Sequence, residues 1–142
     1  MRLTATVPAT SANLGPGFDC FGLALDLCNE ITIETDAEPS VTWEGEGAGE
    51  LATDGSDLVS RALAETAGRF ERALPPMSIR GRNRIPLVRG LGSSAAAAVG
   101  GVALADAALG LGLDPTTLLE VAAGIVGLPI VLYQLSHGAA MD

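Results

Sequence analysis

The feature that most constrains this chain is a glycine-rich loop that leads directly into an alanine-rich segment. The run consists of Pro86, Leu87, Val88, Arg89, Gly90, Leu91, Gly92, Ser93, Ser94, Ala95 and Ala96. Glycines let a backbone curl and present its N–H groups inward, and alanine is the strongest helix former. Because the first N–H groups of a helix are unpaired and lie at the positive end of its dipole, the run predicts an anion site, most naturally for a phosphate. The helix is predicted to run from Ser93 to about Leu109 and to end at Gly110 and Gly112.

Two common nucleotide loops do not fit the run. A P-loop needs a lysine after its last glycine, and all 8 basic residues of this chain are arginine. The pair Gly90 and Gly92 lacks the third glycine of the dinucleotide-binding fingerprint, and no acidic residue follows about twenty positions later in a second strand. A structural turn before a packed helix is the alternative, but the proline and both serines favour the anion site. The hydroxyls of Ser93 and Ser94 are placed to cap the helix or to reach a metal ion held by the phosphates.

Composition limits the classes of protein to which the chain can belong. Its 142 residues correspond to about one domain, and a hydrophobic content of 48% provides an aliphatic core. The net charge of −9 disfavours nucleic acids and anionic membranes as partners, whereas local N–H groups and Mg²⁺ still allow a nucleotide to bind. Cys20 and Cys28 are expected to be buried, reduced thiols. With no secretory leader and no apolar run of membrane length, the chain is expected to be soluble and cytoplasmic.

Alternating and β-branched stretches predict the strands. They are expected at residues 3–7, 21–27, 30–35, 41–43 and 77–85. The first is expected to end at Pro8, before a loop over residues 9–20, and Asn29 is expected to separate the second from the third. Residues 36–54 are acidic and glycine-rich, and they are expected to form a hairpin and a loop around the fourth strand.

The last predicted strand carries an arginine face. Arg80, Arg82 and Arg84 alternate with a second set that consists of Met77, Ile79, Gly81, Asn83 and Ile85. A solvated face is the favoured interpretation, ahead of a positive strip that serves the phosphate loop a few residues later.

Two further helices have local start signals. Asp57 is expected to cap a helix that runs to about Phe70, with its apolar residues on one stripe. Asp114 and Pro115 form an N-cap followed by a proline at the first helical position. Because strands come first and helices later, the predicted fold class is α+β.

Two motifs together resemble those of the GHMP kinase superfamily. Residues 86–96 are similar to its nucleotide loop, and residues 8–19, Pro-Ala-Thr-Ser-Ala-Asn-Leu-Gly-Pro-Gly-Phe-Asp, look like the first motif of its homoserine kinase family. The resemblance covers about residues 3–125. It implies a GHMP kinase N-terminal domain over residues 1–125, related to domain 2 of ribosomal protein S5, and a divergent tail over residues 126–142.

The resemblance also implies a reaction and a set of roles. The reaction is ATP-dependent phosphorylation of the L-homoserine hydroxyl to O-phosphohomoserine, a step toward threonine. Asn13 and Asp19 would bind homoserine, and Asp19 would hold its ammonium group (the favoured role) or accept the hydroxyl proton. Residues 86–96 would wrap the ATP phosphates, while Ser94, with Ser93 as the weaker candidate, and Glu120 would share Mg²⁺.

Other interpretations stay open beside this one. If Glu120 is not a metal ligand, it is a solvated helix glutamate. If the chain does not phosphorylate homoserine, it is another small-molecule GHMP kinase or a catalytically inactive nucleotide-binding protein. A homodimer is consistent with the family.

The resemblance ends near residue 125. Family members usually continue with Glu-Gly-His-Pro-Asp-Asn-Val-Ala-Pro-Ala, whereas residues 126–135 read Val-Gly-Leu-Pro-Ile-Val-Leu-Tyr-Gln-Leu. Leu128 stands in the place of the family histidine, and His137 follows too late to replace it. Family members have a second, ferredoxin-like domain, which is expected to be absent here. A fragment, a frameshifted translation and a short homologue are the open explanations, of which the frameshift fits best. Alone, the chain is expected to have little or no kinase activity and to aggregate or self-associate through its apolar tail.

Overall fold

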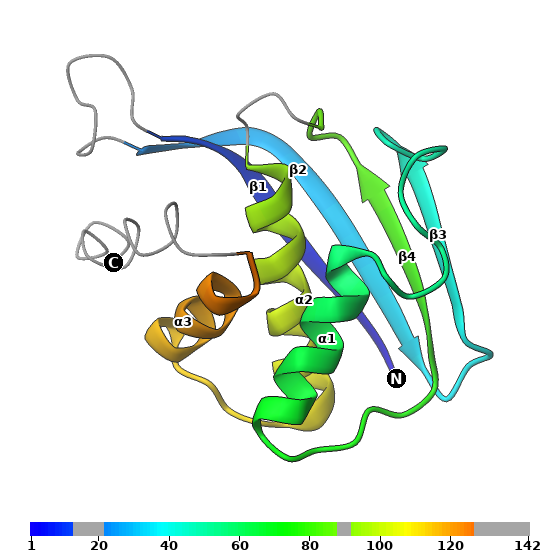
Figure 1. Cartoon of the computed structure of the whole chain (residues 1–142). Helices are drawn as coiled ribbons and strands as arrows, with labels where there is room; N and C mark the ends of the chain where they lie inside the picture. The colour runs from blue at the N-terminus through cyan, green and yellow to red at the C-terminus, as the bar shows by residue number, and fades with distance from the viewer. Residues whose placement is uncertain (13–21, 88–91, 127–142) are drawn as a thin grey trace.

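A four-stranded sheet with helices on one side forms the described part of the chain. The computed structural model describes residues 1–12, 22–87 and 92–126. In chain order the elements are β1 (Arg2–Ala12), β2 (Gly22–Thr35), β3 (Ser40–Gly45), α1 (Leu58–Arg69), β4 (Met77–Asn83), α2 (Ser93–Leu109) and α3 (Pro115–Val126). In Figure 1, α1 and α2 lie side by side across one face of the sheet, and α3 packs on their outer side. This arrangement confirms the predicted α+β class.

The sheet has the strand order β1-β2-β4-β3. The pairs β1–β2 and β2–β4 are antiparallel, and β3 pairs with β4 in parallel. The strand expected at residues 41–43 is present as β3, but the hairpin expected over residues 36–54 is wrong because β4 lies between β2 and β3. The chain leaves β3, passes through α1 and returns along β4, and such a crossover makes neighbouring strands parallel.

Two strand boundaries also differ from the prediction. β1 continues through Pro8 to Ala12, where a loop was expected, and β2 runs without a break through Asn29. Proline is tolerated in β1 because this strand lies at the edge of the sheet, and the register with β2 shifts between Pro8 and Thr10. Pairing with neighbouring strands therefore overrides two local signals that would otherwise end a strand.

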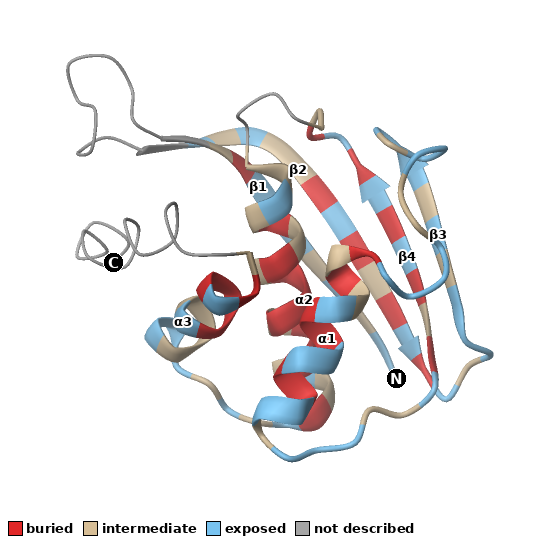
Figure 2. Ribbon diagram, viewed as in Figure 1, coloured by how far each residue is buried: buried red, intermediate tan, exposed pale blue. Residues whose placement is uncertain are grey.

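The core lies between the sheet and α1 and α2. Figure 2 shows buried residues along the facing sides of these elements, and the largest fully buried side chains are Ile31, Ile33, Leu63, Ile85, Val59, Val102 and Thr66. Glycines bring α2 close to its neighbours. A Cβ on Gly100 would lie 2.6 Å from Cδ1 of Ile31, and one on Gly101 would lie 2.5 Å from Cβ of Ala62. The predicted close packing of the small-residue helix on the sheet is confirmed.

Three of the predicted helix ends are confirmed. The Asp57 carboxylate accepts the N–H of Ser60 at 2.9 Å at the start of α1, and Asp114 accepts the N–H of Thr117 at 2.7 Å at the start of α3. Hydrogen bonds from the side chain and backbone of Thr117 hold the pKa of Asp114 below its usual value. Gly110, in the left-handed conformation with φ 63°, follows the last residue of α2.

Within the described ranges, no helix combines the length and apolarity needed to cross a membrane. Cys28 is a free, half-buried thiol rather than a fully buried one. Cys20 lies outside the described residues.

Candidate functional site

The predicted anion site lies between the end of β4 and the start of α2. The structure describes both ends of the predicted loop, while Val88, Arg89, Gly90 and Leu91 lie outside the described residues. Ile85 and Ala96, on either side of the loop, pack with Ala9 in one buried cluster. The loop is therefore closed at its base by the residues that flank it.

The first turn of α2 has no side-chain cap. Gly92 occupies the N-cap position with φ 77° and ψ 30°, and none of the described side chains bonds to that turn. Of the two roles predicted for the hydroxyls of Ser93 and Ser94, that of helix cap is wrong, because both residues already lie inside the helix. Since the first N–H groups of a helix have no intrahelical partner, α2 presents unpaired donors at the positive end of its dipole. The side chain of Ser94 is exposed there, and that of Ser93 is half-buried.

Gly92 has two structural reasons to be glycine. Its positive φ is a conformation that residues with a Cβ rarely adopt. A Cβ at this position would also collide with the hydroxyl of Thr10 on β1. The backbone that enters α2 thus lies directly against the edge strand.

A cavity adjoins the start of α2. Its empty volume is about 480 Å³, including space that is open to solvent. The lining residues come from five elements and two loops: Asn29, Ile31, Trp43, Leu51, Asp57, Leu58, Val59, Asn83, Leu87, Ser93, Ser94 and Ala97. Because Ser93 and Ser94 belong both to the wall and to the helix start, one ligand can occupy the cavity and reach the N–H groups. A mostly apolar ring system joined to an anionic group fits such a site.

Trp43 forms a rigid part of the cavity wall. Its Nε1 donates a hydrogen bond to the carbonyl of Ala52 at 2.9 Å. Its six-membered ring lies over Gly81, where a Cβ would collide with the ring. The indole is therefore held from two sides and offers a fixed aromatic surface to a planar ligand.

Three polar side chains in the wall are almost fully buried. Asp57, Asn29 and Asn83 are 6%, 5% and 7% exposed, respectively. Both carboxylate oxygens of Asp57 bond to Ser60, and Nδ2 of Asn83 lies 3.4 Å from the carbonyl oxygen of Glu46. Sequence reasoning identified Asp57 only as a helix cap and did not assign the two asparagines to a site. A signal was present for Asn83, because it occupies a position that strand alternation places on the buried face.

The sequence profile of the GHMP kinases N terminal domain matches residues 57–130, which is more than half of the chain. The chain belongs to the GHMP kinase family. Two curated relatives illustrate the similarity. The homoserine kinase of Mycobacterium sp. (strain KMS) is 57% identical over 107 residues, which cover 75% of this chain and 34% of the relative. The homoserine kinase of Corynebacterium diphtheriae is 46% identical over 129 residues, which cover 90% and 42%.

Solved structures of GHMP kinases are similar to the chain as well. The homoserine kinase from Cytophaga hutchinsonii superposes with a TM-score of 0.72 at 28% identity and covers 87% of this chain and 40% of that protein. The mevalonate kinase of Methanococcus jannaschii has a TM-score of 0.70 at 16% identity, covers 88% and 46%, and shows the shared fold alone. The chain spans less than half the length of each of these GHMP kinases.

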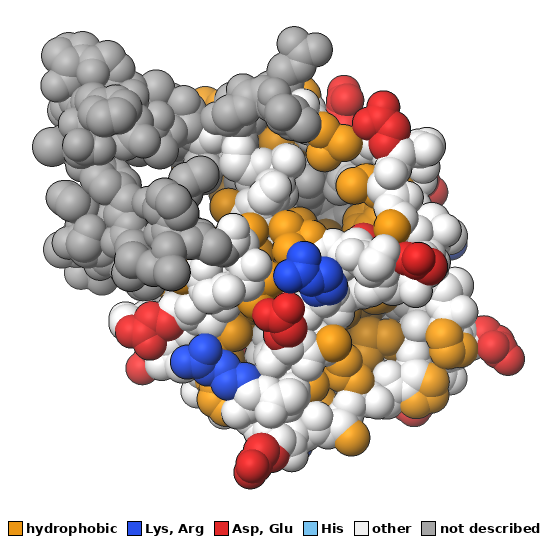
Figure 3. Space-filling model, in the orientation of Figure 1, with side chains coloured by type: hydrophobic (Ala, Val, Ile, Leu, Met, Phe, Trp, Pro, Cys, Tyr) orange, Lys and Arg blue, Asp and Glu red, His pale blue; other side chains and the backbone are white. Residues whose placement is uncertain are grey.

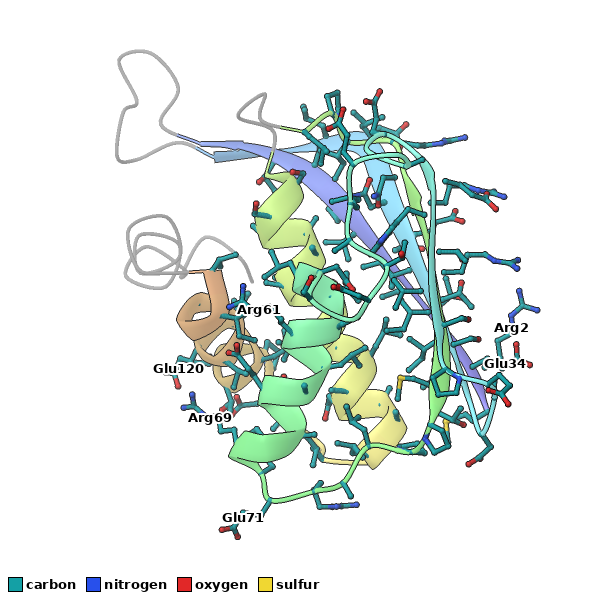
Figure 4. The ribbon with its side chains drawn as sticks, turned by 45° about the vertical axis from the view of Figure 1, so that its right-hand side comes forward. Arg2, Glu34, Arg61, Arg69, Glu71 and Glu120 are labelled. Atoms are coloured by element: carbon teal, nitrogen blue, oxygen red, sulfur yellow. The ribbon has the colours of Figure 1, made fainter. Side chains whose placement is uncertain are left out.

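The structure of this GHMP kinase chain does not bring Glu120 and Ser94 together. Glu120 is exposed on α3, and Figure 4 shows it on the outer side of that helix, well away from the end of α2 that bears Ser94. Among the described residues, no three His, Cys, Asp or Glu side chains are grouped as metal ligands would be. As placed, the two residues do not fit a shared Mg²⁺, and their metal roles stay predictions.

The remaining predicted site residues divide into two groups. Asn13 and Asp19 lie outside the described residues. Arg80 and Arg82 are exposed and alternate along β4 with buried residues, which places them on the opposite face of the sheet from the core. Arg82 lies 3.5 Å from Glu44, with both side chains more than half exposed. This placement favours the solvated-face interpretation of the arginines, because the cavity is lined from the helix side.

Charged side chains on the helix-covered face are interspersed rather than clustered. Figure 3 shows basic side chains beside acidic ones on this face. On α1, the guanidinium of Arg61 lies 3.5 Å from the carboxylate of Glu65. On the described part of this face, the attraction for an anion therefore comes from the backbone at the start of α2.

Proposed function

We propose that this chain carries the nucleotide-binding part of an ATP-dependent homoserine kinase. The reaction is transfer of the γ-phosphoryl group of ATP to the hydroxyl of L-homoserine, which yields O-phosphohomoserine in threonine biosynthesis. The observation that carries the proposal is the uncapped start of α2 beside a cavity with a fixed aromatic wall. The choice of homoserine is supported by curated homoserine kinases that are 57% and 46% identical to the chain.

The chemistry of phosphoryl transfer suits this arrangement. It requires positioning and charge stabilisation more than covalent catalysis. The N–H groups of the first turn of α2 would bind phosphate oxygens, and their orientation is set before the nucleotide arrives. The base would lie in the cavity against Trp43, since the wall is mostly apolar and the indole is fixed.

Magnesium would supply charge neutralisation for the phosphates in such a reaction. The exposed hydroxyl of Ser94 is a suitable oxygen ligand at the start of α2. Glu120, the other predicted ligand, lies elsewhere, so the proposal assigns no step to an ion held by the pair. Asn13 and Asp19 are proposed to bind homoserine, with Asp19 at its ammonium group.

Calorimetric titration with ATP, in the presence and absence of Mg²⁺, tests the proposed metal roles. If Ser94 is a ligand, Ser94→Ala weakens ATP binding by about tenfold with Mg²⁺ and much less without it. If Glu120→Gln has the same Mg²⁺-dependent effect, the two residues share the ion. If Glu120→Gln changes nothing, the carboxylate is solvated.

A substrate comparison tests the proposed activity. Purified chain is assayed for ADP release with homoserine, mevalonate and galactose in parallel. Homoserine-dependent release above the other two supports the proposal, and release with another alcohol identifies a different GHMP kinase. ATP binding without turnover on any alcohol is the result expected if the chain holds only the nucleotide-binding part, and it also agrees with a catalytically inactive nucleotide-binding protein. A chain that binds no ATP contradicts all three.

A cytoplasmic location and a homodimer belong to the same proposal. Light scattering on the purified chain, at several protein concentrations, measures the oligomeric state directly.

A further inference from the structure

One buried asparagine connects the sheet to the predicted nucleotide loop. Asn29 lies in the interior of β2, and only 5% of it is exposed. Its Oδ1 accepts two backbone hydrogen bonds, from the N–H of Arg84 at 2.8 Å and from the N–H of Ile85 at 2.9 Å. Both donors belong to the segment that leaves β4 toward the loop. A single side chain thus holds the backbone at the point where the loop departs.

The position of Asn29 explains why a side chain is needed there. The backbone pairing between β2 and β4 ends at Glu30 and Arg82, and β4 itself ends at Asn83. The next two N–H groups would have no strand partner, and unpaired N–H groups are costly when buried. The amide oxygen of Asn29 takes the place of the missing backbone acceptor and turns the chain out of the sheet.

The segment held by Asn29 is packed as well as hydrogen-bonded. Ile85 is fully buried and shares a cluster with Ala9 and with Ala96, which lies in the first turns of α2. The departure of the loop is therefore fixed by a hydrogen-bonded amide and a buried isoleucine, and its return by Gly92 against Thr10. Loop ends that are fixed in advance reduce the entropy that a bound phosphate must overcome.

We infer that Asn29 is a positioning residue for nucleotide binding, which acts by clamping the backbone N–H groups of Arg84 and Ile85. The inference rests on the proposed function, because the loop matters only if it binds a nucleotide. It does not require that Asn29 touch the ligand. If these two hydrogen bonds to Asn29 favour phosphate binding, then bound phosphate must stabilise the same two hydrogen bonds, because the coupling between them is reciprocal.

The first test uses the unmodified chain. Amide hydrogen exchange is measured by NMR with and without ATP and, separately, inorganic triphosphate, which lacks the base. We expect either ligand to slow exchange at Arg84 and Ile85 by severalfold more than at amides in α1 such as Leu63. Bound ligand with unchanged exchange at Arg84 and Ile85 overturns the inference.

The second test uses three variants. Asn29→Ala removes the acceptor and is expected to weaken inorganic triphosphate binding by about tenfold and to unprotect the two amides. Asn29→Asp keeps an oxygen in place and is expected to restore the protection of both amides. Ile33→Val, in the core away from the loop, is the control for a general loss of stability and is expected to leave binding unchanged.

The outcomes separate the inference from the proposed function. Unmodified chain that binds neither ATP nor triphosphate overturns both. Unmodified chain that binds triphosphate, together with Asn29→Ala that binds it equally well, overturns only the clamp. If Asn29→Ala does not fold, two other measurements test the clamp: amide exchange in the unmodified chain and amide protection in Asn29→Asp. Loss of protection at Arg84 and Ile85 in Asn29→Asp counts against the clamp.

Discussion

The three helices in the described part of the chain begin in two different ways. α1 and α3 start with an aspartate whose carboxylate bonds to the first turn, whereas α2 starts with a glycine that has no side chain to offer. A capping aspartate stabilises a helix start by about 1 kcal/mol, which α2 forgoes. Two starts thus serve stability, whereas the third leaves its N–H groups without a side-chain cap, as the proposed phosphate site requires.

The largest effect is expected from a substitution of the glycine that starts α2. Gly92→Ala is expected to destabilise the chain by about 3 kcal/mol and to abolish ATP binding, because the new methyl group meets Thr10 at a positive φ. Gly110→Ala is the matched control: its φ is also positive, at 63°, but no atom lies within 4 Å of the added Cβ. Gly110→Ala is expected to lower the free energy of unfolding by about 1 kcal/mol and to leave ATP binding intact. Chemical denaturation and ATP calorimetry measure both quantities, and equal effects of the two substitutions would contradict the role of Thr10.

Removal of a cap tests the stabilising side of the comparison. Asp57→Ala is expected to lower the free energy of unfolding by about 1.5 kcal/mol, since both carboxylate oxygens bond to Ser60 in a buried setting. Asp54→Ala removes a nearby exposed carboxylate that caps no helix and serves as the control. Urea denaturation monitored by circular dichroism gives the difference. A chain with Asp57→Ala that is as stable as the control would remove the basis for the comparison.

A negative charge at the start of α2 should have opposite effects on the stability of the chain and on its affinity for ATP. Ser94→Asp is expected to stabilise α2 by about 0.5 kcal/mol through the helix dipole, while ATP affinity falls by at least about tenfold through repulsion of the phosphates. Thr116→Asp, also exposed and also at the second position of its helix, is the control on α3. It is expected to give a similar stabilisation with unchanged ATP affinity. Calorimetry on both variants checks this, and an unaffected affinity in Ser94→Asp would place the phosphates elsewhere.

The smallest expected effect is a pH dependence at the start of α3. Because hydrogen bonds from Thr117 lower the pKa of Asp114 in the folded chain, this carboxylate stabilises the fold above the pKa of the unfolded state. The contribution is lost as the pH falls below about 4, through the lowered pKa. Thermal unfolding from pH 7 to pH 3 should therefore show a decline in the unmodified chain that is shallower in Asp114→Asn, which keeps the acceptor but does not titrate. Parallel curves would rule out this contribution.

The helices could be predicted because their ends are local features. Asp57, Asp114 and Gly110 act within one turn of the residues that they cap, so the sequence pattern is sufficient. The strands were harder, since Pro8 and Asn29 are strand breakers by local criteria. Both lie inside strands because neighbouring strands supply their pairing, and that pairing depends on residues far away in the chain.

The candidate site also combines a part that depends on local sequence with a part that depends on residues far apart in the chain. The loop and the helix start form one continuous stretch and were predicted from it. The cavity is assembled from β2, β3, α1, β4 and α2, so Asn29, Trp43 and Asn83 meet only after folding. A capping role was one of two roles predicted for the two serines, because cap preference does not reveal that Gly92 already occupies that position.

Because Trp43 is packed on Gly81 in the cavity wall, the intrinsic fluorescence of the chain can report on ligand binding there. It is the chain's single tryptophan, so its fluorescence reports on this wall of the cavity alone. A base stacked on the indole would quench the emission, whereas inorganic triphosphate bound only at the helix start would leave it nearly unchanged. The two halves of a nucleotide can thus be told apart in a cuvette, without any label.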